Sequence, residues 1–145
     1  REVALPAILA GDAEAVWPVT KSIVAKAKTM TAADAFRGQY RLAELRMRTA
    51  PVWQRVDALA VPSVPCFPTL AELAADPIGP NTRLGAYTNF VNLLDLCALA
   101  IPAVARSDGL PAGITLIGRR GEDARLAALG LKPMDAFAAV ATEAA

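Results

Sequence analysis

Apolar and polar positions over residues 84–94 repeat with the period of a helix. The apolar face consists of Leu84, Tyr87, Val91 and Leu94. Another face carries Asn89, Asn92 and Asp95, and such an amide-rich stripe resembles a set of positioned hydrogen-bond groups more than a solvated charged face. The pattern therefore predicts a two-faced central helix, followed by a buried strand over residues 98–104.

Two helices are predicted in the N-terminal half. Pro18 suits the first turn of a helix, because the N–H that it lacks would have no partner there. Thr31 and Asp34 have the spacing of a capping box, so a long helix is expected to start at this point. The apolar face expected for this helix consists of Ala33, Phe36, Tyr40, Ala43, Met47 and Ala50.

The remaining pattern predicts strands, loops and shorter helices. A buried strand is expected over residues 56–61, and it should lie beside the strand over 98–104. Three prolines in residues 62–68 exclude a helix there, and Thr69 with Glu72 then opens a short one. The pair Asp108-Gly109 predicts a hairpin between residues 98–104 and 114–118. Further helices are expected after Gly121 and over 131–145, so the fold class is α/β.

Composition limits the class of protein. A chain of 145 residues is long enough for one domain with a core, and 54% hydrophobic against 20% charged residues excludes a disordered tail. No apolar run reaches the roughly 18 residues of a membrane span, and no signal peptide is recognisable, so a soluble, cytoplasmic protein is expected. A formal net charge of +1 without a basic stripe argues against nucleic-acid binding.

The absence of histidine restricts the possible chemistry most. Neither a Ser-His-Asp nor a Cys-His site can be built from this chain alone, and the commonest zinc ligand is missing. Cys66 and Cys97 lack CxxC spacing and are expected to be buried free thiols. The serines, Ser22, Ser63 and Ser107, have no adjacent Ser and no Gly-Ser run. No catalytic residue and no metal site is therefore assigned.

Three segments carry a family resemblance: PIGPNTRLGAY at 77–87, TNFVNLLDLCALAIPA at 88–103 and GLPAGITLIGRRGED at 109–123. They resemble the C-terminal half of amidase-signature hydrolases, most nearly the allophanate hydrolase branch. The likeness runs from about residue 31 to residue 129. It implies part of an amidase-signature fold, with a mixed β-sheet flanked by helices, and it makes residues 1–145 the C-terminal portion of a single, incomplete amidase domain. Residues 131–145 match the family poorly.

The resemblance also implies a reaction. Amidase-signature enzymes use a Ser, a second Ser on a cis peptide and a Lys, all in the N-terminal half, and nothing in this chain matches them. The parent enzyme would hydrolyse allophanate to ammonia and carbon dioxide in urea degradation, without a cofactor. The isolated chain would be inactive. Its expected partners are a small carboxylated amide, the missing N-terminal half of the domain and a second copy in a homodimer.

A substrate-binding role is assigned to Arg83, with Tyr87 and Asn89 as helpers. Arg83 is expected on a loop just before a helix N-terminus, where its guanidinium group can hold a carboxylate with two parallel hydrogen bonds. Tyr87 follows about one turn later, and Asn89 lies on the amide stripe. In the alternative interpretation, Arg83 pairs with Asp76 or a loop carbonyl and Tyr87 belongs to the core.

Other functions stay open at this point. The A subunit of tRNA-dependent amidotransferases shares the fold that the resemblance implies, and a transferase would need a tRNA-binding surface. Another general amidase, or a non-catalytic half-domain that acts in protein interactions, is also compatible with the sequence.

Overall fold

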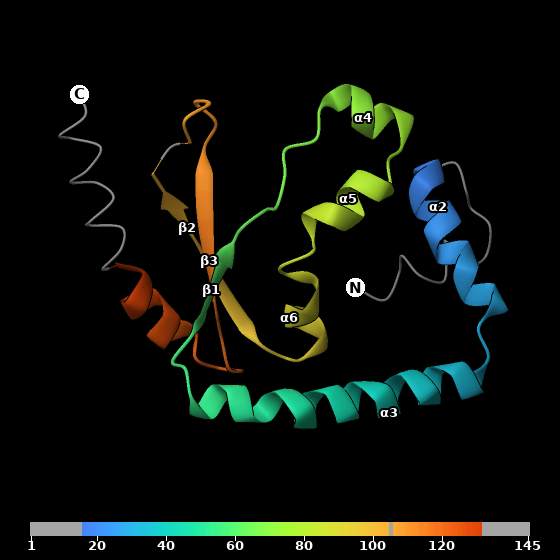
Figure 1. The fold of residues 1–145 in the computed structure, drawn as a ribbon. Coiled ribbons are helices and arrows are strands. Elements are labelled where there is room, and N and C mark those ends of the chain that lie inside the picture. The colour runs from blue at the N-terminus through green and yellow to red at the C-terminus, as the bar shows by residue number, and fades with distance from the viewer. Residues whose placement is uncertain (1–15, 105, 132–145) are drawn as a thin grey trace.

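The computed structural model describes residues 16–104 and 106–131 of the chain. It contains a three-stranded sheet with helices around it, so the predicted α/β class is confirmed (Figure 1). The helix predicted over residues 131–145 lies outside the described residues, apart from its first position.

The N-terminal helices begin where local signals predicted. Helix α2 spans Pro18–Ala25, with the proline in its first turn, and a 3₁₀ turn, η2, follows at Lys26–Thr29. Helix α3 spans Ala32–Thr49 and leads into a second 3₁₀ turn, η3, at Ala50–Gln54. The predicted capping box is present: Asp34 N–H donates to the Thr31 hydroxyl at 3.2 Å, and Thr31 N–H donates to the Asp34 carboxylate at 2.9 Å.

The face of α3 that packs against the rest of the described chain is not the predicted one. Phe36, Tyr40 and Met47 are 62%, 71% and 77% exposed, whereas Leu42 and Leu45 are half-buried. Both sets recur at helical spacing, so periodicity alone could not distinguish them. The apolar face expected for α3 is therefore not the face that packs in the described chain.

The sheet contains β1 (Leu59–Pro62), β2 (Cys97–Ala103) and β3 (Ala112–Gly118) in the order β1-β3-β2. The predicted hairpin of β2 and β3 is confirmed. The prediction that the first strand, β1, lies beside β2 is wrong, because β3 lies between them. Since the hairpin occupies one edge of β3, β1 pairs along its other edge. Both described pairings are antiparallel, so a mixed sheet stays a prediction for the complete domain.

The core lies on the central strand. Ile117 of β3 is fully buried, and Leu126 is 1% exposed. Leu126 belongs to a helix over residues 123–131, which packs on the sheet against Gly118. Gly130 brings this helix close to β2, because a Cβ there would lie 2.8 Å from the Leu99 Cδ2 atom.

The predicted central helix over residues 84–94 is wrong. A short helix α4 at Leu70–Ala75, with the predicted Thr69–Glu72 capping box, precedes two separate helices, α5 at Gly79–Leu84 and α6 at Asn89–Leu93. The Asp76 carboxylate accepts hydrogen bonds of 3.0 Å from Ile78 N–H and Gly79 N–H, which fixes the start of α5. Helix α5 thus begins five positions earlier than Leu84, and a turn over residues 85–88 separates it from α6.

Candidate functional site

The three predicted substrate-binding residues lie on and between α5 and α6. Arg83 is in the last turn of α5, Tyr87 is in the turn that follows, and Asn89 is the first residue of α6. All three are exposed, Tyr87 at 40%. The expected position of Arg83 before a helix N-terminus is therefore wrong. An anion at Arg83 would meet the carbonyl end of α5, so only the guanidinium group itself would attract it.

Arg83 carries an accessible positive charge. Backbone N–H bonds from Gly79 and Ile78 lower the pKa of Asp76, and the charge of Arg83 adds a smaller contribution. Bonds from Thr69 lower the pKa of Glu72, again with a small contribution from Arg83. Within residues 16–104 and 106–131, no carboxylate forms an ion pair with Arg83. The alternative pairing with Asp76 is not formed.

The Asn89 side chain is held against the backbone of Gly85. A Cβ atom at Gly85 would collide with the Asn89 carboxamide, and Asn89 N–H donates to the Gly85 carbonyl at 2.8 Å. The connection between α5 and α6 thus keeps Arg83, Tyr87 and Asn89 close along the chain. No hydrogen bond joins any two of these side chains in the described structure. Each is available to a ligand on its own.

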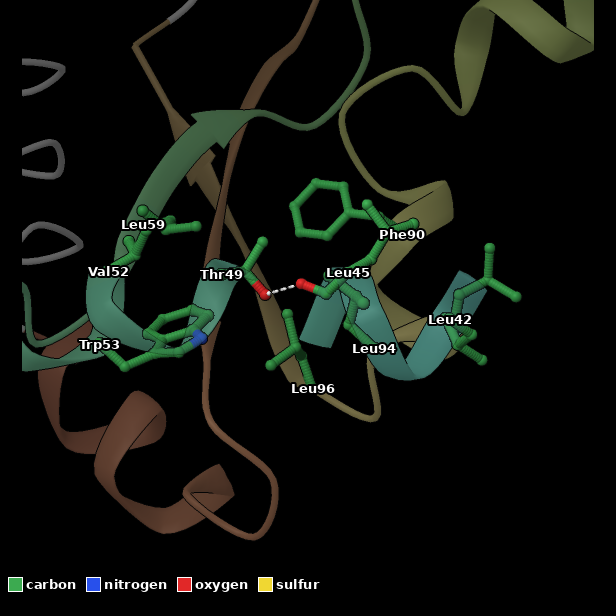
Figure 2. Close-up of a pocket in the computed structure, with 10 residues that line it drawn as sticks. Leu42, Leu45, Thr49, Val52, Trp53, Leu59, Phe90, Leu94 and Leu96 are labelled. Atoms are coloured by element: carbon green, nitrogen blue, oxygen red, sulfur yellow. Dashed lines mark hydrogen bonds between the residues drawn. The ribbon is translucent and has the colours of Figure 1, made fainter. Parts of the chain in front are cut away.

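An apolar cavity of about 430 Å³, which the sequence analysis missed, lies between α3, α6 and the start of β1 (Figure 2). Its lining residues are Leu42, Leu45, Thr49, Val52, Trp53, Leu59, Phe90, Leu93, Leu94 and Leu96. The Thr49 hydroxyl donates to the Leu45 carbonyl at 2.9 Å, so the hydroxyl in this lining is already bonded. The signal for the cavity was the spacing of Leu42, Leu45 and Thr49, a second helical stripe. Such a lining cannot perform acid–base chemistry.

A smaller polar pocket lies beside the apolar cavity and contains three arginines. Arg120 forms an ion pair with Asp95 at 3.1 Å, and Arg119 forms one with Glu122 at 3.0 Å. Arg46 donates to the Leu93 carbonyl at 3.0 Å. Each guanidinium group in this pocket already has a partner. The pocket should therefore attract an anion less strongly than Arg83 does.

Two of the serines have structural partners. Ser63 and Thr115 share a hydrogen bond of 2.9 Å, and Ser22 donates to the Val19 carbonyl at 2.7 Å. Cys66 and Cys97 are free thiols, as predicted, but both are half-buried and not buried. In the described part of the chain, no group of three or more His, Cys, Asp or Glu residues is arranged to hold a metal. None of the described helices has the length and apolarity needed to cross a membrane.

Comparisons with known proteins are consistent with this geometry. A model of the family described as Amidase matches residues 14–127. Urea amidolyase of Lachancea kluyveri is 44% identical over 106 residues, and that of Saccharomyces cerevisiae is 44% identical over 110 residues. These alignments cover 73% and 76% of this chain but only 6% of each relative.

A structural comparison gives the same grouping. Two structures of Kluyveromyces lactis allophanate hydrolase match with a TM-score of 0.65 and 45% identity, over 68% of this chain and 16% of theirs.

A weaker sequence match is to an amidotransferase. The A subunit of the glutamyl-tRNA(Gln) amidotransferase of Xanthobacter autotrophicus is 38% identical over 78 residues, which is 52% of this chain and 16% of that protein. The chain thus spans a small part of the length of each relative that it matches.

Proposed function

This chain belongs to the amidase family, and from that membership we propose that it forms the C-terminal portion of the amidase domain of an allophanate-hydrolysing enzyme. The likeness to Kluyveromyces lactis allophanate hydrolase, at 45% identity, carries this proposal. The amidotransferase match has lower identity and covers only 52% of the chain, which favours the hydrolase over the transferase. We also propose that the enzyme acts in the cytoplasm.

The exposed surfaces of the sheet support a missing N-terminal portion. On one face of β2, Ala98, Ala100 and Pro102 are exposed, and they are small enough for another layer to approach closely. In the described chain, β2 pairs only with β3, so its other edge has free backbone groups. Another part of the same domain would bury these surfaces.

In the proposed enzyme, the two portions have different roles. An activated serine of the N-terminal portion attacks the amide carbonyl carbon, an acyl-enzyme forms, ammonia leaves and water hydrolyses the acyl group. This chain supplies Arg83, whose guanidinium group would hold the carboxylate at the other end of allophanate. Tyr87 and Asn89 would donate further hydrogen bonds.

The division of roles is tested by measuring ammonia release from allophanate. The pure 145-residue chain should release none, whereas the chain joined to the N-terminal portion of the Kluyveromyces lactis allophanate hydrolase amidase domain should be active. Turnover by the chain alone that is lost in Ser63→Ala would contradict the proposal. A joined protein that folds but turns over neither allophanate nor a simple amide would contradict it as well.

The role of Arg83 is tested in the joined, active protein. Arg83→Ala should cost about 2 to 4 kcal/mol of transition-state stabilisation for allophanate, because the substrate carboxylate loses its charged partner. For a neutral amide without a carboxylate, the loss of transition-state stabilisation should be far smaller. Arg48→Ala, which removes an exposed guanidinium group from α3, is the matched control and should change neither rate. Equal losses on both substrates would make Arg83 a structural residue.

A further inference from the structure

The apolar cavity between α3, α6 and the start of β1 is large enough for a small molecule. Its volume of about 430 Å³ lies within the range of ligand pockets, roughly 300 to 1,000 Å³. The rings of Trp53, from η3, and Phe90, from α6, both line it (Figure 2). The one hydroxyl group among the lining residues, that of Thr49, already donates to the Leu45 carbonyl. Such a cavity suits an apolar group and offers water no partners.

The polar pocket adjoins this cavity directly. Four residues line both spaces: Thr49, Trp53, Leu94 and Leu96. Arg46 lies at the boundary between them. It lines the polar pocket, and its guanidinium group donates at 3.0 Å to the carbonyl of Leu93, which is a residue of the cavity. A ligand with its apolar part in the cavity can therefore place a polar end beside Arg46.

Arg46 differs from the other two arginines of the polar pocket in its partner. Arg119 forms an ion pair with Glu122, and Arg120 forms one with Asp95. Within residues 16–104 and 106–131, no carboxylate pairs with Arg46, because those of α3 pair with other arginines of the same helix. The bond from Arg46 to the Leu93 carbonyl uses a single N–H donor, so further donors are available to a carboxylate.

We propose that the cavity and the polar pocket together bind a small amphiphilic monocarboxylate, whose apolar group fills the cavity and whose carboxylate binds Arg46. A free anion gains little from this pocket, but an attached apolar group adds the hydrophobic contribution that the anion alone lacks. A neutral molecule would leave the charge of Arg46 unused. The proposal does not rest on the proposed function, because Arg83, Tyr87 and Asn89 line neither space.

The first test uses the fluorescence of Trp53. The chain has two tryptophans, so Trp17→Phe leaves Trp53 as the only one. Titration of this 145-residue chain with phenylbutyrate should give a saturable change in fluorescence. Phenylbutanol has the same apolar group without the charge and should bind about tenfold more weakly, because the charged hydrogen bond to Arg46 is lost. Butyrate, which lacks the ring, should give no saturable change.

The second test changes the residues at the boundary. Arg46→Gln should weaken phenylbutyrate binding about tenfold and leave phenylbutanol binding unchanged. The matched control Arg48→Gln removes a guanidinium group of the same helix that lines neither space, and it should change neither affinity. Leu93→Glu places a competing carboxylate next to Arg46 and should also weaken phenylbutyrate binding. Leu70→Glu, at a position of α4 that is 86% exposed, should not. Circular dichroism checks that every variant folds.

Four outcomes would overturn the proposal. They are the absence of a saturable change with phenylbutyrate, binding of phenylbutanol as tight as that of phenylbutyrate, binding of butyrate as tight as that of phenylbutyrate, and equal effects of Arg46→Gln and Arg48→Gln. None of these outcomes would affect the proposed function, which is measured by the release of ammonia from allophanate.

Discussion

Leu126 should contribute more to stability than any exposed leucine of the same helix. Its side chain is 1% exposed and lies against Gly118 of β3, so it packs the helix over residues 123–131 against the sheet. Leu126→Ala removes three carbon atoms, which costs about 2.4 kcal/mol at about 0.8 kcal/mol per buried methylene. The cavity left behind adds to this, so the free energy of unfolding should fall by about 3 to 4 kcal/mol.

Urea denaturation, monitored by circular dichroism, measures this fall in the free energy of unfolding. Leu131→Ala is the matched control, because Leu131 is on the same helix but is 61% exposed, and it should cost no more than about 0.5 kcal/mol. Leu126→Met keeps most of the volume and should cost less than about 1.5 kcal/mol. Equal losses in Leu126→Ala and Leu131→Ala would refute the packing of this helix on the sheet.

Three further outcomes are expected. Thr31→Ala removes the cap of α3 and should lower the free energy of unfolding by about 1 kcal/mol in urea denaturation; no change would mean that the cap is dispensable. The hydrogen bonds from the Thr31 hydroxyl and backbone N–H lower the folded-state pKa of Asp34 below its ordinary 3.8, so this cap stabilises α3 above pH 3.8 and is lost as the pH falls through the lower folded value. An NMR titration in which Asp34 has an ordinary pKa would contradict this. Gly109→Ala should destabilise by about 1 kcal/mol, because φ there is +78°, whereas Gly38→Ala, with open space inside α3, should stabilise by a similar amount; effects of the same sign would contradict the assigned backbone conformations.

Local signals in the sequence determined the ends of several elements. The capping boxes at Thr31 and Thr69 involve atoms only three residues apart, and the proline that opens α2 acts within one turn. The turn at Asp108-Gly109 likewise allowed the hairpin of β2 and β3 to be predicted. In each case the stabilising contact lies within a few residues, so no knowledge of distant packing was required.

The sequence also limited the chemistry and identified the family. The absence of histidine excluded the commonest nucleophile–base pairs, and the segment TNFVNLLD indicated the amidase-signature resemblance that the comparisons then confirmed. The choice of Arg83 as a carboxylate ligand came from its residue type and its neighbours in the sequence. Its role stays a prediction, although the structure places it at the exposed end of α5.

Tertiary structure alone decided which surfaces meet. Helix α3 has two apolar stripes with the same period, and only contact with α6 and β1 selects the one that contains Leu42 and Leu45. The insertion of β3 between β1 and β2 depends on which edge of a distant strand is free. The break between α5 and α6 is instead a local feature, because the contacts of Asp76 with Gly79 and of Asn89 with Gly85 span three and four residues. The choice between the two stripes of α3 and the order of the strands are competitions between alternatives of similar local energy, and long-range packing determines their result.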